Sequence, residues 1–268
     1  MLHIYKIRYI LKRLVIKVGS AVLTQKNKIA KERMLNLVSM ISKLKAKYDV
    51  VLVTSGAVAA GYSALKLDKS KQIGKKAIAA AGQPILMTSY KKKFDIFEID
   101  TAQILLTEDD FDSRKRTKMF QDIIDTHLDN DILPIINEND ITSTPEQLFG
   151  DNDQLSANVA HAVGADLLVI LSDIDGYYDK NPKEHDDAKI YKVLHELPKD
   201  SLFDEATPND LFATGGIVTK LKAADFMLKH KRKMYLTNGF NLDYAEQFLL
   251  EGIHTLGTLF EPKEKSIK

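Results

Sequence analysis

Short apolar runs alternate along the chain with longer segments in which apolar residues recur every three or four positions. The short runs predict buried β-strands, and the helical spacing predicts amphipathic helices that cover them. The predicted strands span residues 14–18, 50–53, 102–106, 132–136, 167–171 and 233–236. The predicted helices span residues 31–48, 57–65, 73–97, 115–128, 154–163, 220–229 and 242–250, with Gly82 and Pro84 interrupting the third.

This alternation of strand and helix predicts an α/β fold, a three-layer sandwich with a mostly parallel central sheet between two layers of helices. No internal repeat or long low-complexity linker divides the chain. We therefore expect one domain over residues 14–261. A basic N-terminal arm, residues 1–13, precedes this domain, and a polar tail, residues 262–268, follows it.

Composition narrows the class of protein. The 268 residues are 44% hydrophobic, which is enough for one large α/β domain or two closely packed lobes. Charged residues make up 28%, and the formal net charge of +1 gives no bulk attraction to nucleic acid or to an anionic membrane. There is no cysteine, which excludes disulfides and thiolate metal sites and fits a reducing compartment.

The first residues mix isoleucines and leucines with lysines and arginines, so no apolar run is long enough for a signal peptide or a membrane span. A short organellar presequence and a plain basic arm both fit this composition. We expect a cytoplasmic protein that binds neither membrane nor nucleic acid.

Polar clusters directly follow several predicted strands. In open parallel sheets, ligands bind beyond the carboxyl ends of the strands, so these clusters mark the expected site. They are Gly19-Ser20, Thr54-Ser55-Gly56, Asn137 to Asp140 and Ser172-Asp173.

Two lysines are candidates for contact with an anion. Lys17 lies inside a predicted buried strand, where a charge is costly unless it is paired, although a lysine on an edge strand that reaches water would look the same. Lys220 ends a segment with two glycines that leads into a helix, and free backbone N–H groups at a helix start favour a phosphate. A plain loop with a solvated lysine is the alternative.

Three acidic or amide-rich segments have both functional and ordinary interpretations. Asp151 or Asp153 before a helix fits N-capping, but one cap does not require both acids and Asn152. The cluster from Asn137 to Asp140 is suited to a substrate ammonium or is an ordinary turn. The segment after Ser172 can be interpreted as a turn that covers a nucleotide or as an ordinary surface loop. Neither a Walker A loop nor a G-x-G-x-x-G motif is present.

Together these segments resemble the amino acid kinase family, and within it the kinases of glutamate. The resemblance covers about residues 14–260, and the pairing of GDND with TGG-x-x-TK is its most specific part. The matching segments are residues 15–20 (VIKVGS), 53–61 (VTSGAVAAG), 134–140 (PIINEND), 150–157 (GDNDQLSA), 171–173 (LSD), 176–178 (GYY) and 214–220 (TGGIVTK).

The resemblance implies a role for each matching residue. Lys17 and Lys220 correspond to the lysines that contact the transferring phosphoryl group, and Asp153 to the acid that organises them. Residues implied to bind glutamate are Ser55, Asn137, Asp140 and Asn152. Residues implied to bind ATP are Lys17, Ser172, Asp173, Thr214, Gly215, Gly216, Ile217, Val218, Thr219 and Lys220.

The resemblance also implies a reaction and its partners. It implies that ATP, with Mg²⁺, phosphorylates the γ-carboxylate of L-glutamate to γ-glutamyl phosphate, the first step of proline biosynthesis. It further implies a homo-oligomer, dimer or tetramer, and functional coupling to glutamyl phosphate reductase. Many such enzymes carry a C-terminal PUA domain, and the short tail after Phe260 indicates a form without one.

The chemistry explains why cations are expected. A carboxylate that approaches a triphosphate meets like charge, which two lysines offset, and an ionised carboxylate needs no general base. Asp153 is therefore assigned to positioning. Two alternatives stay open: another kinase of this fold acting on N-acetylglutamate, aspartate, carbamate or UMP, and a non-catalytic sensor of nucleotides or amino acids.

Overall fold

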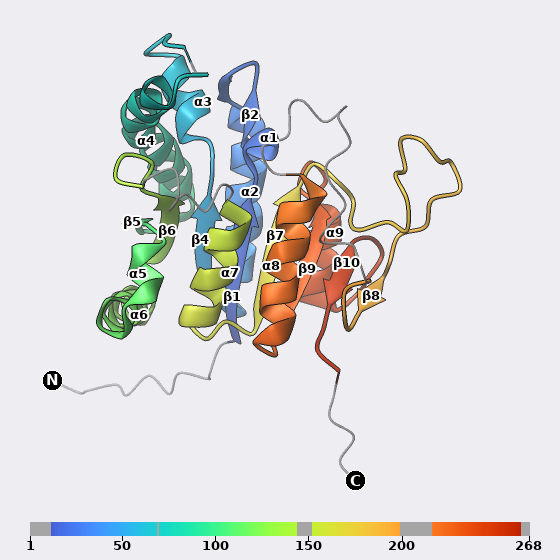
Figure 1. Ribbon diagram of the computed structural model, residues 1–268. Coiled ribbons are helices and arrows are strands. Elements are labelled where there is room, and N and C mark those ends of the chain that lie inside the picture. The colour runs from blue at the N-terminus through green and yellow to red at the C-terminus, as the bar shows by residue number, and fades with distance from the viewer. Residues whose placement is uncertain (1–11, 69, 144–151, 199–215, 264–268) are drawn as a thin grey trace, which may run out of the picture.

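The computed structural model describes residues 12–68, 70–143, 152–198 and 216–263. Within them an eight-stranded sheet forms in the order β5-β6-β4-β1-β7-β9-β10-β8 (Figure 1). The strands are β1 (Lys12–Val18), β4 (Tyr48–Thr54), β5 (Thr101–Leu106), β6 (Leu133–Glu138), β7 (Leu167–Ser172), β8 (Val193–Leu194), β9 (Lys233–Asn238) and β10 (Thr258–Phe260). All neighbours pair in parallel except β9 and β10, so the predicted fold class is confirmed.

Helices cover both faces of the sheet and complete the three layers. One face is covered by α2 (Lys31–Leu44), α3 (Ala57–Tyr62), α4 (Gln72–Phe94) and α9 (Asp243–Glu246). The other is covered by α6 (Arg114–Asp129), α7 (Asn152–Ala162) and α8 (Ile217–Lys229), seen in the foreground of Figure 1. Each face packs its own apolar core, because successive strand residues point to opposite sides.

Strand β1 lies in the centre of the sheet, between β4 and β7. Its residues alternate between the two cores: Leu14 and Ile16 face α2 and α4, whereas Val15 faces α7 and α8. Lys17 pairs in register with Val53 on one side and Ile170 on the other. By the same alternation, its side chain shares the face of Val15. The interpretation of Lys17 as an edge-strand lysine is therefore wrong.

Several short elements were not predicted. They are α1 (Ser20–Leu23), the hairpin β2 (Thr24–Gln25) and β3 (Lys28–Ile29), α5 (Asp109–Asp112), β8 and β10, whereas the 3₁₀ turn η1 (Asp95–Phe97) and the π-helical turn η2 (Gln247–Glu251) lie at the ends of the predicted helices 73–97 and 242–250. Such elements are too short to show a period in sequence and depend on tertiary contacts. The predicted helix over 31–48 ends at Leu44 instead, and Tyr48 begins β4.

Gly82 and Pro84 do not break α4, which runs unbroken from Gln72 to Phe94. The glycine instead allows α3 and α4 to touch through their backbones. A Cβ at Gly82 would lie 1.8 Å from the Ala57 carbonyl oxygen, and one at Gly61 would lie 1.9 Å from that of Ile78. The predicted interruption was therefore wrong, and glycine marks a close helix crossing.

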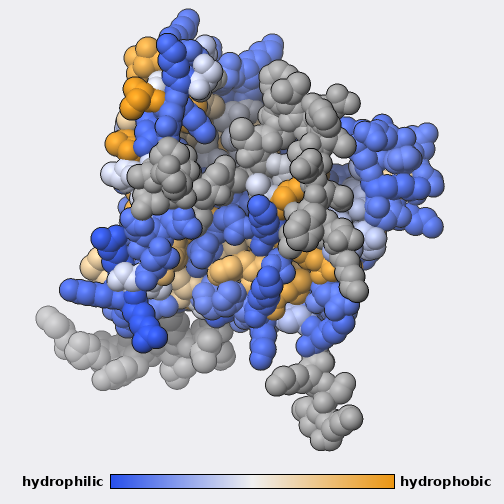
Figure 2. Space-filling view, in the orientation of Figure 1, coloured by the Kyte–Doolittle hydropathy of each residue, from blue (hydrophilic) through white to orange (hydrophobic). Residues whose placement is uncertain are grey.

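The helices are short or carry charge. The longest, α4, has 23 residues and includes five lysines. Among the described residues, no helix is long and apolar enough to cross a membrane. The face shown in Figure 2 is mostly hydrophilic, with separate hydrophobic areas.

Candidate active site

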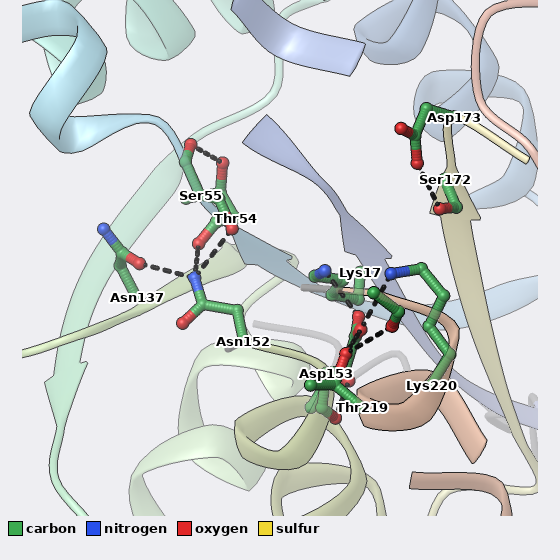
Figure 3. Close-up of polar contacts among 12 residues, drawn as sticks. Lys17, Thr54, Ser55, Asn137, Asn152, Asp153, Ser172, Asp173, Thr219 and Lys220 are labelled. Atoms are coloured by element: carbon green, nitrogen blue, oxygen red, sulfur yellow. Dashed lines mark hydrogen bonds and ion pairs between the residues drawn. The ribbon is translucent and has the colours of Figure 1, made fainter. Parts of the chain in front are cut away.

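Two lysines from distant parts of the chain converge on one carboxylate (Figure 3). The Lys17 ammonium lies 2.5 Å from Asp153 Oδ1, and the Lys220 ammonium lies 3.2 Å from Asp153 Oδ2. The three side chains come from β1, the first turn of α7 and the first turn of α8. The fold thus brings together the three residues that we predicted to be catalytic.

This triad is buried: Lys17 is 3% exposed, Asp153 0% and Lys220 5%. By themselves these three side chains carry a net charge of +1, and charge interactions are strong away from bulk water. Such an arrangement attracts an anion. Lys220 is not a solvated loop lysine, so that simpler interpretation is wrong. Asp153 contacts a lysine with each of its oxygens. Asp151, the other candidate for capping the helix, lies outside the described residues.

The α8 segment supplies a further contact to Asp153. Helix α8 begins at Ile217, three residues earlier than predicted, with Gly216 as its N-cap. Thr219 Oγ1 donates to Asp153 Oδ2 at 3.0 Å and lies 2.9 Å from the Gly216 carbonyl oxygen. Ile217 packs against the α7–α8 core, and Val218 follows it in the first turn. Thr214 and Gly215 lie outside the described residues.

Asn152, one residue before Asp153, joins a second polar cluster at the ends of β4 and β6 (Figure 3). Its Nδ2 donates to the Thr54 carbonyl oxygen at 2.5 Å, to Ser55 Oγ at 2.9 Å and to Asn137 Oδ1 at 2.9 Å. A buried hydrogen bond of 2.7 Å between the hydroxyls of Thr54 and Tyr90 ties this strand end to α4. Three of the four predicted glutamate-binding residues are therefore connected, because Ser55 and Asn137 both contact Asn152.

The fourth, Asp140, lies two residues beyond β6, and no hydrogen bond links its carboxylate to the Asn152 cluster within the described residues. Burial raises the pKa of Asp140, and the charges of Lys75 and Lys76 on α4 oppose that rise. Lys76 also donates to the carbonyl oxygens of Ile141 and Ser143, which holds this loop against α4. Asn137, predicted as part of the turn, is instead a buried residue of β6.

A third polar group lies at the ends of β7 and β9. Ser172 Oγ donates to Asp173 Oδ1 at 3.0 Å, and the Ser172 carbonyl accepts from Gly239 N at 2.7 Å. Asn238 Nδ2 donates to Asp175 Oδ1 at 2.7 Å. Asn238 and Gly239 were not among the predicted site residues, although they follow the predicted strand 233–236 and the same strand-end rule applies to them.

Helix α7 is anchored at the end opposite to Asn152 and Asp153. The carbonyl oxygens of Ala162, Val163 and Ala165 accept from the side chains of Gln121, Arg13 and Arg232, respectively. Cations and N–H donors at a helix C-terminus satisfy its unpaired carbonyls and oppose the negative end of its dipole. These contacts fix the axis of the helix whose first turn presents the site.

Among the described residues, no group of three or more His, Asp or Glu side chains could hold a metal ion. Both oxygens of Asp153 already accept from lysine, so this carboxylate does not fit the role of a magnesium ligand.

The three polar groups lie in line along one edge of the sheet. They follow the strand order β6, β4, β1, β7 and β9, with the lysine triad in the middle. This arrangement is suited to moving an anionic group between two substrates. It has an amide cluster on one side, the two lysines in the centre and a second polar group on the other side. These are the features of a phosphoryl-transfer enzyme.

Comparison with known proteins agrees with this class. A family model described as "Amino acid kinase family" matches residues 12–238. The chain belongs to the amino acid kinase family. Membership of a kinase family implies the use of ATP.

Within that family, two similar curated relatives have the same name. The chain is 55% identical to "Glutamate 5-kinase" of Wolinella succinogenes over 255 residues, which cover 93% of this chain and 98% of the relative. It is 52% identical to "Glutamate 5-kinase" of Leishmania donovani, with 95% and 97% covered.

Solved structures agree in fold at low sequence identity. An isopentenyl phosphate kinase of T. acidophilum superposes with a TM-score of 0.62 at 16% identity and covers 94% of this chain and 100% of its own. A UMP kinase from Ureaplasma parvum gives 0.59 at 15% identity, covering 94% and 99%. These matches show the fold alone.

Proposed function

We propose that this protein transfers the γ-phosphoryl group of ATP to the γ-carboxylate of L-glutamate. The products are ADP and γ-glutamyl phosphate, the first intermediate of proline biosynthesis. The observation that carries the proposal is the pair of buried lysines on one carboxylate, next to an amide cluster that suits an amino acid.

The lysines answer the main difficulty of the reaction. Two unit charges about 4 Å apart repel by roughly 4 kcal/mol at an effective dielectric constant near 20, and a carboxylate facing a triphosphate creates several such pairs. Lys17 and Lys220 supply positive charge from two sides. A carboxylate oxygen of glutamate forms the new bond to the γ-phosphorus while the bond to the ADP oxygen breaks.

Asp153 positions the lysines and takes no proton from the substrate. A glutamate γ-carboxylate, with a pKa of about 4.3, is already ionised at neutral pH, so the reaction needs no general base. The Asp153 carboxylate lies between two ammonium groups that would otherwise repel each other, and each of its oxygens contacts one of them.

The Asn152 cluster is suited to the amino-acid end of the substrate. Because Asn152 Nδ2 faces a backbone carbonyl, its Oδ1 is an acceptor with no hydrogen bond from the described residues. We assign this oxygen and the Asp140 carboxylate to the substrate ammonium, with Ser55 and Asn137 in support. An acetylated amine offers these acceptors a single N–H and no positive charge, so a free amino acid fits better than N-acetylglutamate or a nucleotide.

On the other side of the triad, we assign Ser172, Asp173 and the segment from Thr214 to Lys220 to ATP. Mg²⁺ enters with the nucleotide, because this ion is commonly held through substrate phosphates and a few protein oxygens. It would supply further charge neutralisation on the phosphate oxygens.

The proposal extends to the setting of the enzyme. We propose that it acts in the cytoplasm as a homo-oligomer, dimer or tetramer, and passes its reactive acyl phosphate to glutamyl phosphate reductase. The division into an arm over 1–13, a kinase domain over 14–261 and a tail over 262–268 stays a prediction.

The test traps the acyl phosphate. The full chain is incubated with ATP, Mg²⁺ and hydroxylamine, with L-glutamate, aspartate and N-acetylglutamate compared side by side and UMP tested by ADP release. Hydroxamate should form with glutamate above the other acceptors. Nucleotide binding without turnover of any acceptor would contradict the proposal and favour a sensor.

A substitution of Lys220 links this activity to the site. Lys220→Ala should lower kcat on the order of 10²-fold or more, because a fixed cation at the transferring group is lost. Circular dichroism and an unfolding curve check that the variant is folded. A folded variant with unchanged turnover would remove Lys220 from the site.

A further inference from the structure

Gln83 of α4 has a buried side-chain N–H group with no acceptor among the described residues. Its Nε2 is enclosed, yet it has no hydrogen-bond partner in the described part of the chain. Its Oε1 accepts from Asn137 Nδ2 at 2.9 Å, so the side chain belongs to the same network as Asn152 and Ser55. Buried donors are normally satisfied, so an exception next to a binding site needs an explanation.

The orientation of the Gln83 amide follows from its neighbours. The backbone N–H of Glu138 can only donate, and it lies 2.9 Å from Asn137 Oδ1. This oxygen also accepts from Asn152, so the nitrogen of the Asn137 amide must face Gln83. The atom of Gln83 that receives this N–H must be its oxygen. Neither hydrogen of Gln83 Nε2 is therefore directed at Asn137. The hydrogen-bond network, and not the electron count of the amide atoms, fixes this orientation.

The position of Gln83 is rigid. It follows Gly82, where the backbones of α4 and α3 are in contact, and its partner Asn137 is buried in β6. Helix α3 directly follows Ser55 and Gly56 at the end of β4. The contact between α3 and α4 thus fixes Gln83 relative to the β4 end that carries Ser55.

We propose that Gln83 Nε2 donates to the α-carboxylate of the substrate and makes the site specific for an α-amino acid. The inference rests on the function proposed above. The ammonium and the γ-carboxylate of glutamate already have assigned partners, in acceptors around Asn152 and in the two lysines. The remaining polar group is an α-carboxylate, which only accepts hydrogen bonds, and Gln83 offers the unused donor.

The test compares L-glutamate with L-isoglutamine, in which the α-carboxylate is replaced by a carboxamide while the ammonium and γ-carboxylate are kept. Gln83→Glu keeps the acceptor for Asn137 but replaces the N–H donor by a carboxylate oxygen. It should lower kcat/KM for glutamate by roughly 10- to 100-fold and leave KM for ATP unchanged. The ratio of kcat/KM for isoglutamine to kcat/KM for glutamate should rise by at least about tenfold.

A second variant and a control separate recognition from structure. Gln83→Met removes the donor without adding charge. It should likewise reduce the ratio of kcat/KM for glutamate to kcat/KM for isoglutamine. Gln72→Glu makes the same charge change at an exposed position of α4, about 16 Å away along the helix, and should leave both kinetic constants unchanged.

The outcomes distinguish this inference from the function on which it rests. If wild-type protein forms no hydroxamate from glutamate, the proposed function fails. A second outcome is that wild-type protein is active, but neither Gln83 variant changes the ratio of kcat/KM for isoglutamine to that for glutamate. Gln83 then only supports Asn137, and the inference is overturned.

Discussion

At the scale of single residues, the site depends on charges that are tolerated because each has a partner. Lys17 sits in a central strand, where an unpaired ammonium would be strongly destabilising, and Asp153 compensates it at 2.5 Å. Lys220 then adds a second cation to the same carboxylate. Two cations next to one carboxylate are suited to contact an anionic group during its transfer.

Asp140 gives a prediction for pH dependence. Burial raises the pKa of its carboxyl group, and the charge of Lys75 lowers it. Lys75→Gln removes that charge, so the Asp140 pKa should rise further and the carboxylate should become protonated at a higher pH. A protonated Asp140 cannot pair with the substrate ammonium. As pH is lowered, KM for glutamate should therefore begin to rise at a higher pH in the variant than in the wild type.

The measurement is KM for glutamate against pH in both proteins. Titration of the substrate itself is the same in both, so the difference reports on the enzyme. Lys92→Gln, an exposed lysine near the other end of α4, is the control and should leave the profile unchanged. If the profiles of wild type and Lys75→Gln coincide, the predicted effect of Asp140 ionisation on glutamate binding is contradicted.

At the scale of elements, helix contacts place residues that the sequence leaves far apart. Helix α7 points its first two residues at different groups, Asn152 toward β4 and β6 and Asp153 toward β1 and α8, while Arg13 and Arg232 hold its other end. Helix α4 reaches the amide cluster only because Gly82 lets it touch α3. The spacing between helices is thus part of the site.

Gly82→Ala tests that spacing. The added Cβ would lie 1.8 Å from a backbone oxygen of α3, so one helix must move. The free energy of unfolding should fall by about 3 kcal/mol, and KM for glutamate should rise in the protein that remains folded, because Gln83 and Ser55 shift apart. Chemical denaturation measures the free energy of unfolding, and steady-state kinetics measures KM for glutamate.

Ala80→Ser, at an exposed position two residues earlier, should change neither the stability nor KM appreciably. Equal stability of the Gly82→Ala variant and the wild type would show that the two helices can separate without cost. The close contact would then not be what positions Gln83.

At the scale of the whole molecule, the strand order sets the order of the substrate groups. Neighbouring parallel strands lie about 4.8 Å apart, so β6 to β9 spans roughly 19 Å along the carboxyl edge. The amide cluster ends β4 and β6, Lys17 lies on β1, and Ser172 ends β7. An extended amino acid and a nucleotide can then meet end to end above β1.

This order predicts how kinetic effects divide between substrates. Asn137→Ala should mainly raise KM for glutamate, Asp173→Ala should mainly raise KM for ATP, and Lys17→Met should mainly lower kcat, because each residue serves a different group. Asn130→Ala, which precedes β6 at the opposite edge, should change none of these constants. A variant of Asn137 that alters only KM for ATP would reverse the proposed orientation of the substrates.

Much of this architecture could be predicted from the pattern of residues. Six of the eight strands in the sheet follow from apolar runs, and Lys17 stood out because charge is rare inside a buried strand. The short strands β8 and β10 could not be predicted, since two or three residues carry no periodic signal. Gln83 was missed because a polar residue in a long helix is ordinary until its partner is known.

By itself, the sequence determined which segments become strands and helices and which edge of the sheet carries polar residues, because burial and backbone geometry impose local periods. Only the tertiary structure decided that residues 17, 153 and 220 meet at one carboxylate and that Gln83 faces Asn137. Such contacts join positions more than fifty residues apart, and their distances depend on how helices pack on the sheet rather than on any local pattern.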